Sequence, residues 1–222
     1  MKIYSEPARE EWDELLARPL QEETAEVRRR VESIVERVRE DGDAALRELA
    51  DQFDGVRLTG LEVDEREFEE AEGRVDEALK EAIRQAFDHV AAFHRAQRME
   101  PVRVETMPGV ECCQRSVPIG RVGLYVPGGS APLFSTVLML AVPARIAGCR
   151  EVTLCTPPRR DGSVAPEILW TARLCGVKRV FKVGGAQAVA AMAFGTESVP
   201  KVDKIFGPGN RYVTAAKQLL GL

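Results

Sequence analysis

The chain has 222 residues, of which 45% are hydrophobic and 30% charged, a composition typical of soluble globular proteins. Its net charge of -4 lacks the basic excess that nucleic-acid binding needs, so we expect no nucleic-acid partner. The N-terminus is rich in acidic residues, and the longest apolar run, Val137 to Val142, is too short to cross a bilayer, so we expect a cytoplasmic protein with no membrane partner.

The first part of the chain predicts two consecutive amphipathic helices. The first has apolar residues at steps of three and four, namely Val27, Val31, Ile34, Val35 and Val38. Thr24 can cap this helix and Asp41-Gly42 can end it. Asp43 then opens a second helix, which stops at Asp54-Gly55. Both helices have an apolar stripe that needs a partner surface.

A third helical pattern runs from Leu79 to Phe93 and must end by Pro101, which has no amide hydrogen to continue the helix. The following segment, Val102 to Val117, alternates apolar and polar residues on both sides of Pro108-Gly109. This pattern predicts a β-hairpin between the helical part of the chain and the rest.

After Gly120 a strand, a loop and a helix recur four times. The predicted strands are Val122 to Val126, Glu151 to Cys155, Arg179 to Val183 and Val202 to Phe206. The predicted helices are Phe134 to Ala147, Pro166 to Cys175, Ala186 to Phe194 and Tyr212 to Leu220. Short apolar strands alternating with helices predict a parallel sheet with right-handed crossovers. The predicted fold class is α/β, a helical N-terminal region followed by a Rossmann-like parallel sheet of βα repeats.

Three of the loops that follow these strands carry glycines: Pro127-Gly128-Gly129, Gly184-Gly185 and Gly207-Pro208-Gly209. Loops after parallel strands open onto one rim of a sheet, where glycine lets a ligand approach the backbone and helix N-termini favour anions. A polar side chain accompanies each loop, namely Tyr125, Gln187 and Asn210. A phenol and two amides suit a nucleotide but are poor nucleophiles and proton carriers. The pattern predicts a nucleotide-binding or anion-binding rim.

The residues offer no catalytic pair and no metal site. Ser130 and Ser135 have no histidine near them in sequence, and neither a Gly-x-Ser-x-Gly elbow nor a phosphate-binding P-loop occurs. His89 and His94 are five positions apart on one helix, whereas a helical zinc pair uses four. The five cysteines form no Cys-x-x-Cys pair, so we expect buried, reduced thiols: Cys112, Cys113, Cys149, Cys155 and Cys175.

Three long stretches resemble one known family. They are "GLYVPGGSAPLFSTVLMLAVPARIAGCREVTLCTPP" (Gly123 to Pro158), "LCGVKRVFKVGGAQAVAAMAFGTESVPKVDKIFGPGN" (Leu174 to Asn210) and the N-terminal "VRRRVESIVERVREDGDAALRELADQFDG". All three are similar to histidinol dehydrogenase, and the resemblance spans essentially the whole chain. It implies an aldehyde-dehydrogenase-like architecture, with a charged helical region over residues 1–117 and part or all of a βα-repeat, NAD-contacting domain over residues 118–222.

The resemblance also implies a reaction and its cofactors. The family oxidises L-histidinol to histidinaldehyde and then to L-histidine, reducing two NAD in the last steps of histidine biosynthesis, as a zinc-dependent homodimer. The family's NAD contacts fall on Tyr125 in "LYVPGG", Gln187 in "GGAQA" and Asn210 in "GPGN". They are the same three side chains that the rim pattern selects.

The family's zinc ligands and its Glu-His pair of proton carriers belong to a segment expected after Leu222, and none has a counterpart here. We therefore expect no catalytic and no metal-binding residue in this chain, and no turnover of histidinol by it alone. We also expect a homodimer, or association with a C-terminal portion that covers exposed apolar surface.

Two alternatives remain open on the residues alone. An aldehyde-dehydrogenase-like NAD domain would need a nucleophilic cysteine near the rim, and Cys155 is the one candidate by position. A non-catalytic nucleotide-binding or interaction module would need no such group.

Overall fold

The computed structural model of the protein describes residues 4–17, 25–129 and 131–221. The helices in these residues are η1 (Arg9–Glu11), α1 (Trp12–Leu16), α2 (Ala25–Asp54), α3 (Glu65–Arg74), α4 (Glu77–Ala96), α5 (Phe134–Ala147), α6 (Pro166–Leu174), α7 (Gly185–Phe194) and α8 (Arg211–Leu220). The strands are β1 (Val102–Met107), β2 (Val110–Gln114), β3 (Arg121–Tyr125), β4 (Glu151–Thr156), β5 (Arg179–Lys182) and β6 (Lys204–Phe206). The expected cap Thr24 and the loop residue Ser130 lie outside the described residues.

The predicted α/β fold class is confirmed by a four-stranded parallel sheet in the order β5-β4-β3-β6. The chain moves from β3 outward to β4 and β5, and then returns to place β6 on the other side of β3. The point between β3 and β6 is therefore the topological switch point of the sheet. In open α/β sheets, ligands bind at such a point, beyond the carboxyl ends of the strands.

Two hydrophobic clusters cover the two faces of this sheet. Side chains alternate along β3, so Tyr125 contributes to one cluster while Val122 and Leu124 contribute to the other. On the Tyr125 face, α2 packs against α7 and α8. On the opposite face, α5 and α6 pack with α3 and α4. The amphipathic N-terminal helices thus find their partner surface on both sides of the sheet.

The two predicted N-terminal helices follow one another within α2, and a kink at Gly42 separates them. Gly42 has φ 51° and ψ -126°, a conformation outside the helical region. Directly after this break, the buried carboxylate of Asp43 accepts hydrogen bonds from Thr196 Oγ1 at 2.6 Å, from the Ser198 amide at 3.2 Å and from Ser198 Oγ. The predicted break is confirmed, and Asp43 attaches it to the loop after α7.

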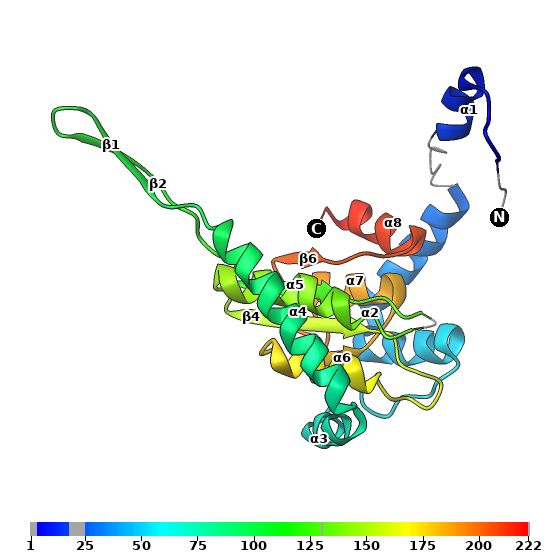
Figure 1. The fold of residues 1–222 in the computed structure, drawn as a ribbon. Coiled ribbons are helices and arrows are strands. Elements are labelled where there is room, and N and C mark those ends of the chain that lie inside the picture. The colour runs from blue at the N-terminus through cyan, green and yellow to red at the C-terminus, as the bar shows by residue number, and fades with distance from the viewer. Residues whose placement is uncertain (1–3, 18–24, 130, 222) are drawn as a thin grey trace.

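The predicted β-hairpin is confirmed as the antiparallel pair β1–β2, which extends away from the body of the molecule (Figure 1). Every residue of both strands is exposed, including the apolar side chains of Val102, Val104, Met107 and Val110. An isolated two-stranded ribbon is marginally stable in water.

Candidate functional site

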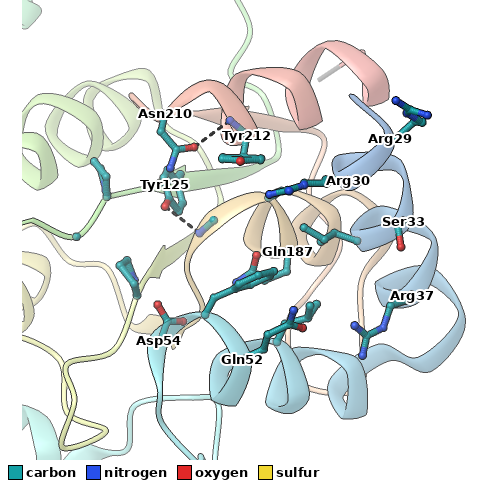
Figure 2. Close-up of a pocket in the computed structure, with 18 residues that line it drawn as sticks. Arg29, Arg30, Ser33, Arg37, Gln52, Asp54, Tyr125, Gln187, Asn210 and Tyr212 are labelled. Atoms are coloured by element: carbon teal, nitrogen blue, oxygen red, sulfur yellow. Dashed lines mark hydrogen bonds between the residues drawn. The ribbon is translucent and has the colours of Figure 1, made fainter. Parts of the chain in front are cut away.

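A cleft of about 930 Å³ lies at the carboxyl ends of the strands, at the topological switch point (Figure 2). The loops after β3, β4, β5 and β6 all contribute to it, through Gly128, Pro157, Gly185 and Asn210 respectively. The predicted common rim of the glycine-bearing loops is therefore present. Tyr125 at the end of β3, Gln187 in the first turn of α7 and Asn210 at the start of α8 all line this one cleft.

Tyr125 is the last residue of β3, and its side chain is only 4% exposed. The phenol oxygen accepts a hydrogen bond from the Gly185 amide at 2.9 Å, at the start of α7. Burial raises the pKa of the Tyr125 phenol above its ordinary value, so the group is neutral at pH 7 and keeps its own proton to donate. Tyr125 can thus bind a ligand oxygen, but it does not supply a base.

Gln187 lies in the first turn of α7 and is also 4% exposed. Among the described residues its side-chain amide has no hydrogen-bond partner, which leaves two donors and one acceptor for a ligand. A buried amide usually has such partners within the protein. Gln187 is therefore suited to bind a polar group that enters the cleft.

Asn210 presents only the donor end of its side-chain amide to the cleft. Its Oδ1 accepts hydrogen bonds from the amides of Tyr212 at 3.0 Å and Val213 at 3.1 Å, so Asn210 is the N-cap of α8. N-cap oxygens satisfy amide groups that have no partner within the helix. Only the Nδ2 donors of Asn210 remain available to a ligand.

The opposite wall of the cleft comes from α2 and was not predicted from the sequence. Three arginines in the first half of α2 line the cleft, namely Arg29, Arg30 and Arg37 (Figure 2). Asp54, the last residue of the same helix, lines it too. Arg30 pairs with Glu26 and Arg37 with Glu48, each at 2.6 Å, whereas Arg29 forms no ion pair with a carboxylate in the described part of the chain. The wall therefore offers positive charge to an anionic ligand.

The structure removes Cys155 as a candidate nucleophile. Its side chain is fully buried within the sheet, and burial raises the pKa of its thiol far above the ordinary value. A reactive cysteine needs an accessible thiolate. The expectation of buried thiols is confirmed for Cys155 and Cys175. It is wrong for Cys112 and Cys113, because the β1–β2 hairpin that carries them is wholly exposed, and Cys149 is only half-buried.

Within residues 4–17, 25–129 and 131–221, no group of three His, Cys, Asp or Glu side chains could hold a metal ion. Neither of the chain's two histidines lines the cleft. No helix of the described ranges is long and apolar enough to cross a membrane.

A parallel sheet covered by helices on both faces, with a cleft at its switch point, defines an α/β domain of the doubly wound class. The family model for histidinol dehydrogenase matches residues 17–221, and the chain belongs to that family. Histidinol dehydrogenase from Bacteroides fragilis (strain YCH46) is 56% identical over 222 residues, which are 100% of this chain and 52% of that protein.

Two further comparisons agree. Histidinol dehydrogenase from Xanthomonas euvesicatoria pv. vesicatoria is 59% identical over 203 residues, 91% of this chain and 47% of the relative. The crystal structure of histidinol dehydrogenase from Elizabethkingia anophelis matches with a TM-score of 0.91 and 45% identity, over 97% of this chain and 49% of that chain. The chain spans about half the length of the curated relatives it matches.

Proposed function

We propose that this chain supplies the NAD-binding part of a histidinol dehydrogenase, the enzyme that oxidises L-histidinol to L-histidine through histidinaldehyde. One observation carries the proposal: Tyr125, Gln187 and Asn210 come from three separate elements of the fold and line a single cleft at the switch point of the sheet. These are the positions to which the family resemblance assigns NAD contacts. The cleft volume of about 930 Å³ is within the range of small-molecule and cofactor sites.

The chemistry of the cleft suits NAD. The Tyr125 hydroxyl and the Asn210 amide can donate to ribose or carboxamide oxygens, and Gln187 can both donate and accept. The arginines of α2 face the same space and favour the negatively charged pyrophosphate. When bound, NAD supplies the hydride acceptor, and the residues of this chain bind and orient it.

The described residues do not fit the zinc ion of the family, because they contain no set of three candidate ligands. The proton transfer that alcohol oxidation needs finds no histidine and no ionised phenol in the cleft, because neither histidine lines it and the Tyr125 phenol is neutral. The proposed role of this chain is therefore cofactor binding.

We further infer that a partner surface, either a second copy or the remainder of a full-length family member, covers the β1–β2 hairpin. The exposed Val104 (51%) and Met107 (60%) support this inference, because contiguous exposed apolar groups mark interaction sites.

NAD is expected to raise the melting temperature of the chain. At about tenfold above the dissociation constant, a ligand stabilises by roughly 1.4 kcal/mol, which is about 3 °C for a protein of this size. Thermal-shift measurements of the unmodified protein and of the variants below, with and without NAD, test this expected rise in melting temperature. Gln187→Ala and Asn210→Ser are expected to reduce the shift, because each removes an amide that faces the cleft.

Two features make the test specific. Asn210→Ser keeps an N-cap oxygen for α8, so its melting temperature without ligand should stay close to that of the unmodified protein. His94→Ala is the matched control, because His94 lies on α4 outside the cleft and contacts Gln97. An equal loss of the NAD shift in all three variants would contradict the assignment of the cleft.

A further inference from the structure

Four helices, α5 to α8, each follow one strand of the parallel sheet, and they differ in what their first amides bind. The first amides of a helix have no partner within it, and free ones favour anions. At α8, Asn210 accepts hydrogen bonds from the amides of Tyr212 and Val213. Helices α5 and α6 contribute no residue to the described lining of the cleft. Among these four helices, α7 is therefore the one that can present free amides to a ligand in the cleft.

The start of α7 has two such amides. The N-cap residue is Gly184, which has no side-chain oxygen to cap the helix. The Gly185 amide donates to the Tyr125 hydroxyl at 2.9 Å. The next two amides, those of Ala186 and Gln187, have no hydrogen-bond partner among the described residues. Both residues line the cleft, so the cleft wall contains two amides that need an acceptor.

The Gln187 side chain is a second, independent feature of the same helix end. It is only 4% exposed, lines the cleft and has no hydrogen-bond partner in the described part of the chain. It lies over the first turn of α7, because a Cβ atom built on Gly185 would be 2.7 Å from its Oε1 and 3.4 Å from its Nε2. Buried amides are rarely left without a partner, so this one is best explained by a group that enters the cleft.

The donors at this helix end favour a negatively charged acceptor. Backbone amides and the Nε2 group donate hydrogen bonds, and a helix N-terminus carries positive partial charge. Across the cleft, α2 contributes three arginines, of which Arg29 has no carboxylate partner among the described residues (Figure 2). Asp54, the one carboxylate of the described lining, acts against an anion. A phosphate group, with several acceptor oxygens and negative charge, satisfies all these donors at once.

We propose that the start of α7 is the oxyanion subsite of the cleft, and that it binds the pyrophosphate of the dinucleotide through the Ala186 and Gln187 amides and the Gln187 side chain. In sheets with the Gly-x-Gly-x-x-Gly fingerprint, the pyrophosphate lies at the helix after the first strand. The corresponding helix here, α5, begins at Phe134 and does not line the cleft, so the subsite lies in the third βα unit instead. The proposal rests on the proposed function, because it assigns one part of the dinucleotide within the same cleft.

Inorganic pyrophosphate is the probe for this subsite. Titrated into the isotope-labelled chain, it should shift the backbone amide NMR signals of Ala186 and Gln187 in a saturable way, because both amides gain an acceptor. The Val213 amide is the internal control, since Asn210 already occupies it, and its signal should stay unchanged. Sodium chloride at the same ionic strength should shift none of the three. Unmoved Ala186 and Gln187 signals, or equal shifts with chloride, would overturn the proposal.

Two glutamine variants test the same subsite by titration calorimetry with pyrophosphate. Gln187→Glu should fold, because glutamate is favourable in the first turn of a helix. It should weaken pyrophosphate binding by about tenfold or more, since a negative charge replaces two donors. Gln52→Glu is the matched control, because Gln52 lines the same cleft from α2, and its effect should stay below about threefold. Equal losses in the two variants, or none in Gln187→Glu, would contradict the assignment to α7.

The subsite and the proposed function can fail separately. NAD binding that leaves the Ala186 and Gln187 signals unmoved would overturn the subsite and leave the proposed function standing. Pyrophosphate binding at these two amides without any binding of NAD would retain the subsite and remove the proposed function. Absence of both would remove both.

Discussion

Replacing Gly207 with alanine is expected to lower the free energy of unfolding by about 3 to 5 kcal/mol, through backbone strain added to overpacking. Gly207 has φ 134°, a conformation that side-chain-bearing residues rarely adopt. A Cβ atom there would lie 2.1 Å from the carbonyl oxygen of Tyr125 and 3.1 Å from its amide nitrogen. Both are backbone atoms of β3, a strand in the interior of the sheet, so neither can move without disrupting the sheet.

Urea denaturation of Gly207→Ala measures this loss, and Gly73→Ala is its control. Gly73 lies within α3, and a Cβ atom added there would meet nothing within 4 Å. Alanine at such a helical position should stabilise the protein by about 0.5 to 1 kcal/mol. The account would be contradicted if Gly207→Ala unfolded at the same urea concentration as the unmodified protein, because the loop that carries Asn210 would then not need its close approach to Tyr125.

Replacing Asp43 with alanine is expected to cost about 2 to 4 kcal/mol, because it removes a buried charged acceptor and leaves its donors unpaired. The carboxylate accepts from Thr196 and twice from Ser198, and Arg47 lies 3.6 Å away. These bonds hold the break in α2 against the loop after α7. Since the two halves of α2 provide the arginines and Asp54, loosening this contact should also weaken NAD binding.

The pH dependence of stability distinguishes this network from simple packing. Burial alone would raise the pKa of Asp43, but hydrogen bonds from Ser198 and Thr196 outweigh it and lower the pKa below its ordinary value of 3.8. A lowered pKa stabilises the folded state above pH 3.8, and this contribution is lost as the pH falls through the folded-state pKa. The stability difference between the unmodified protein and Asp43→Asn should therefore shrink below pH 3.8. A difference independent of pH would contradict the role of the charge.

Much of the fold is predictable because its signals are local. The four strands of the sheet were predicted at nearly their observed positions, since short apolar runs between glycine and proline turns leave little choice. Helix α3 was missed, because most of its residues are charged and only Phe68 and Ala71 are buried. Its capping box was readable in the sequence, where Asp64 accepts from the Glu67 amide and Glu67 Oε2 accepts from the Asp64 amide.

The candidate site was predictable only from its sheet side. Tyr125, Gln187 and Asn210 follow strands, and the carboxyl ends of parallel strands share one edge, so their meeting follows from topology. The wall that α2 provides depends on how this helix packs against α7 and α8, which no local pattern encodes. A negative residue at the end of a helix was a visible signal for Asp54, because it opposes the helix dipole. The Asp54-Gly55 pair was interpreted only as a helix stop.

Titrating NAD into the isotope-labelled chain, with detection of its backbone amide signals by NMR, tests the central claim most directly. The account predicts that the signals of Gly185, Gln187 and Tyr212 shift with NAD, because their residues line the cleft. The signals of the β1–β2 hairpin, which lies away from the cleft, should stay unchanged. Shifts that are absent, or confined to residues outside the cleft, would contradict the claim that Tyr125, Gln187 and Asn210 form one NAD site.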